Sequence, residues 1–311
     1  MKNYIYFLIL FSNFIFADEC DLLRELYLSR PQKSEFLPVD FAGSCGRGDK
    51  YKVKKRWLEN PSVKKLVQNF NKFCKTKPLD LFSQKEKIPK IFHFVWIGPP
   101  MPDRVKVAID SWRYFHPDYT IKIWDDAAVE SIDWISEKFK HNFSIAASYS
   151  EKSDYIRVQV LYNFGGIYVD TDFICLKSFD CLVDKDIEFF AGFELCYGTK
   201  EVSFLLNGAL MGCVAKSKIL ENCFSTFIPI DEAPQLNPAI RTGPHAISKA
   251  VDQYITSFGN EGILALPCTY FYPTFYEWKI PKISNNYEEF LKLIGTETMA
   301  VHLWAHSWAN Q

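Results

Sequence analysis

The stretch SDYIRVQVLYNFGGIYVDTD, residues 153–172, decides the fold of this chain. Ser153 is a candidate helix N-cap, apolar residues follow it at helical spacing, and Gly165 and Gly166 end the periodic run. The run GIYVD, residues 166–170, has the apolar and β-branched character of a strand. The stretch therefore predicts a helix, a turn at two glycines, and a strand that ends in acidic residues.

The same alternation of elements continues upstream. IFHFVWIG, residues 91–98, is an apolar run ended by Gly-Pro-Pro and predicts a buried strand, while residues 103–115 have helical spacing. YTIKIWDD, residues 119–126, alternates as a strand does. Strands alternating with helices predict an α/β domain with a largely parallel sheet. Because ligands of such sheets bind beyond the carboxyl ends of the strands, we expect the site where these strands end.

Two acids follow the strand that ends the deciding stretch. Asp170 and Asp172 are two residues apart, so both carboxylates point to one side and can face one divalent cation, which can neutralise a diphosphate. Asp154 and Arg157 lie one helical turn apart and share a face, where the Asp can hold sugar hydroxyls and the Arg can meet a phosphate or orient the Asp. An Asp-x-Asp pair alone is a common acidic turn. The preceding helix and glycine pair favour a functional site.

Composition excludes several classes of protein. The chain has 311 residues, of which 48% are hydrophobic, and it contains 27 Phe, 16 Tyr and only 14 Gly. Disordered, collagen-like and coiled-coil chains do not have this composition. Lys plus Arg is 36 against 37 for Asp plus Glu, giving a net charge of −1, so a basic nucleic-acid footprint is absent and we expect no nucleic-acid partner.

The N-terminus predicts export. Lys2 precedes the apolar residues 4–16, and Ala17 follows them, which is the pattern of a signal peptide over residues 1–17. The alternative is an uncleaved signal anchor that tethers the chain to a membrane through residues 4–16. Either reading puts the chain on a secretory route: exported, periplasmic, or in the ER or Golgi lumen. We expect a mainly helical extension over residues 18–86 and one α/β domain over residues 87–311.

Cysteines and one basic run leave alternatives open. The nine Cys contain no C-x-x-C pair, so a structural zinc site is not expected. Some Cys can pair in an exported protein, and Cys175 and Cys181 are close enough in sequence to be considered. The basic run KYKVKKR, residues 50–56, fits a solvated face, with a membrane surface or an anionic acceptor as the minority reading.

The residues 153–172, together with KIFHFVWIG at 90–98, resemble the sugar-binding region of family 32 glycosyltransferases. That group includes Golgi mannosyltransferases, α-galactosyltransferases, inositol-phosphoceramide mannosyltransferases and bacterial polysaccharide enzymes. The large clostridial glucosylating toxins are a more remote likeness. The resemblance runs from Pro89 to near the C-terminus. It implies a Rossmann-like GT-A fold for 87–311, a UDP- or GDP-linked sugar donor, Mn²⁺ or Mg²⁺, and retaining transfer of a hexose to a carbohydrate or glycolipid acceptor.

The resemblance also implies roles for individual residues. Trp96, at the end of the first strand, would stack on the nucleobase. Asp170 would reach the ribose and the metal, and Asp172 would ligate the metal directly. Asp154 and Arg157 would hold the donor sugar. Trp96 also has a plain interpretation as a core residue of an apolar strand.

Weaker similarities lie further along the chain. Asn207 would lie near the metal or the sugar, and His302 would be a ligand of the metal or diphosphate. Ser307 and Trp308 would close over the diphosphate from the C-terminal tail. His306 stands where the family tail usually has Gly, which makes His306 a second candidate for the role of His302.

Three functions fit these residues. The first is a glycosyltransferase that modifies a glycan, glycolipid or polysaccharide. The second is a secreted toxin or effector that glycosylates a host protein through the same site. The third is a metal-dependent sugar-binding protein, which would need Asp170 and Asp172 but not Asp154, Arg157 and Trp96. For the enzyme, retention requires a carboxylate nucleophile or front-face attack assisted by the leaving phosphate, and the preference for front-face attack follows from the family resemblance.

Overall fold

The computed structural model describes residues 18–32, 35–41, 44, 58–75, 88–183, 186–194, 204–274 and 278–305. Predicted features at residues 1–17, 50–56 and 306–308 lie outside these ranges. The three strands expected from the sequence are present as β1 (Ile91–Val95), β2 (Thr120–Trp124) and β3 (Gly166–Val169). The expected helices are present as α5 (Asp103–Phe115) and α8 (Tyr149–Phe164), and α4 (Pro61–Lys75) lies in the extension expected to be mainly helical.

A mixed six-stranded sheet forms the centre of the molecule. Its order is β2-β1-β3-β6-β5-β7, with β5 (Phe189–Phe193), β6 (Leu206–Cys213) and β7 (Ile263–Leu266). Strand β1 is parallel to β2 and β3, and β5 is parallel to β7, but β6 is antiparallel to both β3 and β5. The α/β class is confirmed, whereas the largely parallel sheet is corrected to a mixed one. Every residue of β6 is buried, and such a run carries no signal of strand direction.

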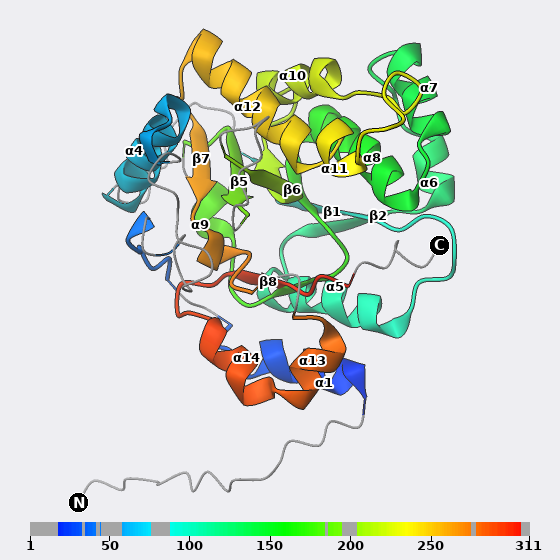
Figure 1. Cartoon of the computed structure of the whole chain (residues 1–311). Coiled ribbons are helices and arrows are strands. Elements are labelled where there is room, and N and C mark those ends of the chain that lie inside the picture. The colour runs from blue at the N-terminus through cyan, green and yellow to red at the C-terminus, as the bar shows by residue number, and fades with distance from the viewer. Residues whose placement is uncertain are drawn as a thin grey trace, which may run out of the picture.

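Helices cover both faces of this sheet (Figure 1). Helix α8 packs with α10 (Lys218–Thr226) and α12 (Pro244–Phe258) on one face. Helix α5 packs on the opposite face, where the ring of Trp112 contacts Phe92 of β1 at 4.9 Å between centroids. Shorter helical segments complete the fold: α6 (Asp126–Glu130), α7 (Glu137–Ile145), α9 (Asp180–Val183), α11 (Pro238–Arg241), a 3₁₀ turn (Cys268–Tyr270), α13 (Ile280–Asn285) and α14 (Tyr287–Leu293).

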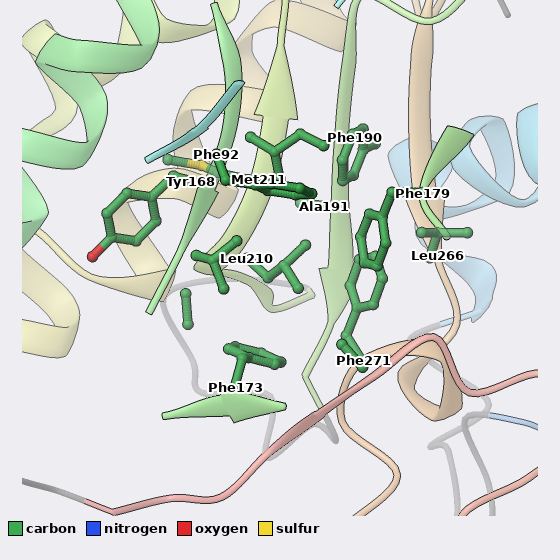
Figure 2. Close-up of a cluster of buried hydrophobic side chains, with 14 of the residues drawn as sticks. Phe92, Tyr168, Phe173, Phe179, Phe190, Ala191, Leu210, Met211, Leu266 and Phe271 are labelled. Carbon is green, nitrogen blue, oxygen red and sulfur yellow. The ribbon is translucent and has the colours of Figure 1, made fainter. Parts of the chain in front are cut away.

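Many of the buried side chains packed against the sheet are aromatic (Figure 2). The rings of Phe179 and Phe271 stack at 5.5 Å with an interplanar angle of 8°, and Phe92 contacts Phe179 edge-on at 6.4 Å. These rings come from segments far apart in the sequence, so their burial joins the C-terminal part of the chain to β1. Offset and edge-to-face pairs of this kind add to the stabilisation that comes from area burial.

A second, two-stranded sheet brings the C-terminal segment to β3. It pairs β4 (Phe173–Cys175) antiparallel with β8 (Ala300–His302), so that Phe173 lies opposite His302. Strand β4 begins directly after Asp172. The pairing therefore places His302 beside the acids that follow β3, although about 130 residues separate them in the chain.

The segment before residue 87 contributes helices where it is described. α1 (Glu19–Leu28) packs on α5, and α4 packs on β7 at the edge of the sheet (Figure 1). Among the described residues, no helix combines the length and apolar character that crossing a membrane requires. The Cys175 thiol is free and donates a hydrogen bond to the Lys177 carbonyl oxygen at 3.2 Å, so no Cys175–Cys181 disulfide is formed.

Candidate active site

An open cleft of about 370 Å³ lies at the carboxyl ends of β1, β3 and β5. Seven residues expected from the sequence line it: Trp96, Asp154, Arg157, Asp170, Asp172, Asn207 and His302. The cleft therefore lies where the sequence analysis expects the site, and the functional role of these residues stays a prediction. Because β6 runs antiparallel to β3, the beginning of β6 supplies Asn207 to the same edge of the sheet.

Helix α8 carries Asp154 and Arg157 into the cleft, but it begins earlier than expected. Its N-cap is Ser148, whose hydroxyl oxygen accepts a hydrogen bond from the Glu151 amide at 3.1 Å. The prediction of Ser153 as the N-cap is wrong. Ser153 lies inside the helix, and its hydroxyl donates to the Tyr149 carbonyl oxygen at 2.8 Å. Serine can make either bond, so its identity alone does not fix the first helical residue.

The glycine pair makes the turn from α8 into β3. Gly165 has φ +63° and Gly166 has φ +99°, which are conformations that favour glycine. A Cβ on Gly166 would lie 2.6 Å from the Ile91 carbonyl oxygen of β1. The close approach of these backbones brings β3 alongside β1 and sets where the acids after β3 emerge.

His93 of β1 forms a hydrogen bond to this turn. Its Nε2 donates to the Gly165 carbonyl oxygen at 2.9 Å, and its Nδ1 accepts from Trp124 Nε1 at 3.1 Å. Burial lowers the pKa of His93 to about 4, so the ring is neutral near pH 7. His93 is therefore a hydrogen-bonded core residue.

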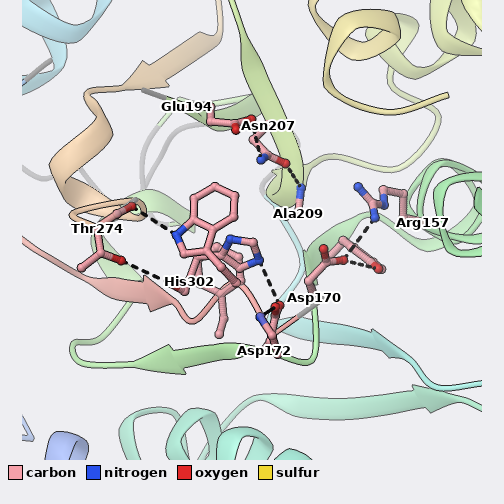
Figure 3. A network of polar contacts seen from close by, with 12 residues as sticks. Arg157, Asp170, Asp172, Glu194, Asn207, Ala209, Thr274 and His302 are labelled. Carbon is pink, nitrogen blue, oxygen red and sulfur yellow. Dashed lines mark hydrogen bonds and ion pairs between the residues drawn. The ribbon is translucent and has the colours of Figure 1, made fainter. Parts of the chain in front are cut away.

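Arg157 joins two carboxylates across the cleft floor. Its Nη2 lies 3.1 Å from Asp154 Oδ1 and 3.1 Å from Asp170 Oδ1 (Figure 3). The hydroxyl of Thr242 donates to Asp154 Oδ2 at 2.6 Å, and that of Tyr168 donates to Asp170 Oδ1 at 2.7 Å. The prediction that Asp154 and Arg157 share a helix face is confirmed. The ion pair between Arg157 and Asp170 links helix α8 to the end of β3.

Burial shapes the charges of this cluster. Asp154 is 5% exposed, and burial raises its pKa to about 6 against the opposing effects of Arg157 and Thr242. Burial works against the charge of Arg157 as well, but Asp170, Tyr168 and Asp154 outweigh it and raise the pKa of the guanidinium. Arg157 therefore stays a fixed positive charge under the cleft.

Asp170, Asp172 and His302 form a group that could hold a metal ion. One ligand atom from each lies within 4.8 Å of those of the other two. Asp172 Oδ1 is 3.0 Å from His302 Nε2, and Asp172 Oδ2 accepts from the Ala305 amide at 2.9 Å. Two carboxylates and an imidazole suit Mn²⁺ or Mg²⁺. Among the described residues, His302 Nδ1 is buried without a hydrogen-bond partner, while Nε2 faces Asp172.

Asp172 and His302 shift each other's pKa. Burial raises the pKa of Asp172, but the His302 charge and the Ala305 amide outweigh it, so the pKa lies below its usual value. Burial lowers the pKa of His302, but Asp172 outweighs it and the pKa is raised. Without a metal, this pair is therefore an ion pair.

Aromatic rings hold the His302 imidazole in place. Phe173 stacks on it at 4.6 Å between centroids, and Trp304 meets it at 4.2 Å with an interplanar angle of 66°. Trp304 has φ +51°, which is uncommon for a bulky residue, and its Nε1 donates to the Thr274 carbonyl oxygen at 3.2 Å. Sequence reasoning missed Trp304, which lies two residues after His302 and also lines the cleft.

Asn207 anchors the opposite wall of the cleft. Its Nδ2 donates to Glu194 Oε2 at 2.9 Å, and its Oδ1 accepts from the Ala209 amide at 2.8 Å (Figure 3). Glu194 was also missed, although it follows an apolar run directly, which is the same signal that marked Asp170. Burial raises the pKa of Glu194 against the opposing effects of His302 and Asn207.

Trp96 lies half-buried directly after β1, at the cleft edge. Its Nε1 donates to the Pro99 carbonyl oxygen at 2.7 Å. Stacking of Trp96 on a nucleobase stays a prediction. Of the C-terminal residues predicted to act here, His306, Ser307 and Trp308 lie outside the described residues.

Comparison with known proteins finds a family that matches the sequence of this site. The family described as the glycosyltransferase sugar-binding region containing a DXD motif matches residues 102–188. The matched segment of the DXD sugar-binding region carries Asp154, Arg157, Asp170 and Asp172, so the resemblance noted from the sequence is confirmed.

Individual relatives share parts of this region. Inositol phosphoceramide mannosyltransferase 1 of Schizosaccharomyces pombe is 32% identical over 108 residues, which is 33% of this chain and 33% of that enzyme. Lactosylceramide 4-alpha-galactosyltransferase of Mus musculus is 30% identical over 161 residues, 49% of this chain and 40% of that enzyme. The solved PaToxG glycosyltransferase covers 63% of this chain and 78% of its own, with 18% identity and a TM-score of 0.43. The chain spans about a third of the length of the first of these relatives.

Proposed function

We propose that this protein is a metal-dependent glycosyltransferase of the GT-A form, which moves a hexose from a UDP- or GDP-sugar to a glycan, glycolipid or polysaccharide acceptor. The observation that carries the proposal is the cleft in which Asp170, Asp172 and His302 converge beside the Asp154–Arg157 pair. The match of residues 102–188 to the DXD family supports the same reaction class. Two of the matched enzymes are named for a lipid, inositol phosphoceramide in one and lactosylceramide in the other. These names support a glycolipid as one acceptor class.

Different residues of the cleft would bind different parts of the donor. Asp170, Asp172 and His302 would hold Mn²⁺ or Mg²⁺, and the bound ion would neutralise charge on the diphosphate as the nucleotide leaves. Arg157 supplies a fixed positive charge beside that diphosphate. Asp154 is held by Thr242 and Arg157 in a position to accept hydrogen bonds from sugar hydroxyls.

Three finer features belong to the proposal. Transfer with retention, by front-face attack, follows the family resemblance alone. Export by a secretory route follows from the N-terminal residues 1–17. A host protein as acceptor, in the manner of a secreted effector, is the alternative that acceptor labelling in a host-cell lysate would detect.

The test measures nucleotide release by the full chain from UDP-glucose, UDP-galactose, UDP-N-acetylglucosamine and GDP-mannose, with Mn²⁺ and with EDTA. We expect Mn²⁺-dependent release from one donor and a loss of at least about 100-fold in Asp172→Asn, since a ligand to the diphosphate-neutralising ion is removed. Asp125→Asn is the matched control. Asp125 also follows a strand, but its Oδ1 caps α6 and does not line the cleft, and Asn caps equally well.

The contrary result is also informative. A folded chain that binds Mn²⁺ but releases nucleotide from none of the four donors, with or without a glycolipid acceptor, would contradict the proposed glycosyltransferase activity. It would favour the metal-dependent sugar-binding protein.

A further inference from the structure

Trp304 lines the cleft beside the metal-binding group, and the proposed function gives it no role. Its ring is partly buried and meets the ring of His302 at 4.2 Å between centroids, with an interplanar angle of 66°. The indole Nε1 already donates to the Thr274 carbonyl oxygen. Trp304 therefore offers a ligand in the cleft an aromatic surface rather than a hydrogen-bond donor.

The backbone holds Trp304 in an uncommon conformation. Its φ is +51°, which costs a bulky residue about 1–2 kcal/mol. Both neighbours are fastened to Asp172, since the Leu303 amide donates to its carbonyl oxygen and the Ala305 amide donates to its Oδ2, each at 2.9 Å. A costly conformation persists where the surroundings fix it, and such positions are frequent at ligand sites. The ring is thus held in place beside the metal-binding acids before any ligand arrives.

The order of the strands places Trp304 away from the end of the cleft where Trp96 lies. Trp96 follows β1, and the metal-binding acids follow β3, which pairs with β1. The Trp304 ring packs on Tyr272 at 6.1 Å between centroids, and Tyr272 packs on β5, where a Cβ on Gly192 would lie 2.9 Å from its ring. Strand β6 separates β5 from β3. Trp96 and Trp304 therefore stand on opposite sides of the metal-binding group.

This placement leaves the Trp304 side of the cleft to the acceptor. The family resemblance puts the nucleobase at Trp96, and Asp154 and Arg157 would hold the donor sugar. Figure 3 shows Arg157 and His302 on opposite sides of the acids after β3. Front-face attack brings the acceptor hydroxyl to the side of the anomeric carbon from which the phosphate leaves, so the acceptor has to bind beside the metal site. The ring of Trp304 meets this requirement, because it contacts His302.

We propose that Trp304 is the platform on which a sugar ring of the acceptor stacks. The inference rests on the proposed function. A hexose ring has a face of C–H groups, whose slightly positive hydrogens pack on the negative face of an aromatic ring. The hydroxyls at the edge of the stacked sugar stay available for transfer. As one hydroxyl oxygen bonds to the anomeric carbon, the bond from that carbon to the phosphate oxygen breaks, and this oxygen keeps the electron pair and takes the hydroxyl proton. The acceptor is accordingly a carbohydrate, and not a side chain of a protein.

The test measures nucleotide release by the full chain with Mn²⁺ and the best donor of the panel, first to water alone and then with added acceptor. The acceptors are lactose and the methyl glycosides of glucose, galactose and mannose. Sorbitol is the comparison, because it has hydroxyls but no ring. We expect at least one sugar, but not sorbitol, to stimulate release saturably. Trp304→Leu should raise the KM for that sugar by at least about tenfold, and Trp304→Phe, which keeps a ring, should raise it less.

Other readouts separate stacking from a structural role. Release to water, the donor KM and the Kd for Mn²⁺, measured by titration calorimetry, should change less than about threefold in Trp304→Leu, because the lost contact is made only with the acceptor. A tryptophan that merely held His302 in place would instead weaken Mn²⁺ binding. The matched control is Trp134→Leu. Trp134 is also partly buried, but its ring stacks on Phe143 and does not line the cleft, so this variant should match the unmodified chain.

Several results would overturn the assignment while leaving the proposed function standing. They are release to water that no sugar stimulates, stimulation by sorbitol equal to that by the sugars, a sugar KM in Trp304→Leu no higher than in the Trp134→Leu control, and a loss of Mn²⁺ affinity that accounts for the whole effect. No release by the unmodified chain from any donor would instead overturn the proposed function, and the assignment with it.

Discussion

The ion pair between Arg241 and Glu151 gives the sharpest test of how the cleft is built. Arg241 Nη2 lies 2.8 Å from Glu151 Oε1, and the two side chains are 2% and 0% exposed. Arg241 precedes Thr242, which donates to Asp154, and Glu151 lies one turn before Asp154 on α8. The pair therefore fastens the segment that ends in Thr242 to the helix that carries the donor-binding residues.

Replacing Arg241 by Met leaves a buried carboxylate without its cation. At an effective dielectric constant of about 20, the attraction at this distance is on the order of 6 kcal/mol. Removing one partner of a buried pair typically costs about 3–5 kcal/mol, because the other charge stays buried and unpaired. We expect Arg241→Met to lower the free energy of unfolding by about 3–4 kcal/mol, or roughly 5 °C in Tm.

Urea unfolding at pH 7 measures this loss. The double variant Arg241→Met, Glu151→Gln should recover most of the stability, since it buries no charge. The control Lys138→Met breaks a pair with Glu232 whose side chains are 76% and 56% exposed, and it should cost less than about 1 kcal/mol.

A small loss would refute this reasoning. If Arg241→Met lost less than about 1 kcal/mol, the pair would not hold the segment to α8. Nucleotide release provides the functional readout. The KM for the donor should rise in Arg241→Met, because Thr242 loses its fixed position against Asp154.

Two further predictions concern buried groups outside the cleft. Burial lowers the pKa of His116 to about 4 from its ordinary 6.5, so the unfolded chain takes up this proton first as the pH falls. The stabilising effect is complete above pH 6.5 and is lost toward pH 4, and the unmodified chain should lose about 3 kcal/mol more than His116→Gln over this range in urea unfolding. Parallel profiles would contradict it. Gly166→Ala should lower the free energy of unfolding by at least about 2 kcal/mol, because its φ is +99° and the new Cβ would meet the Ile91 carbonyl oxygen. A thermal melt indistinguishable from that of the unmodified chain would show that the turn tolerates a Cβ.

Much of the cleft could be predicted because its signals are local. Asp154 and Arg157 share a helix face through their spacing alone, and Asp170 and Asp172 share a side of the chain after β3 in the same way. The glycines between them mark a turn that other residues do not adopt readily. The start of α8 was misplaced because Ser148 and Ser153 offer the same chemistry to the backbone.

The sequence by itself determined the alternating elements, the aromatic core and the acids at the end of β3, because periodicity and residue chemistry act over a few neighbouring positions. Only the tertiary structure decided the direction of β6, the partner of Asp172 and the place of Glu194. Strand β6 is buried along its whole length and reads the same in either direction. His302 reaches Asp172 through the pairing of β8 with β4, and Glu194 reaches Asn207 across β5 and β6. Contacts of this kind depend on which distant strands pair, and no local pattern records that choice.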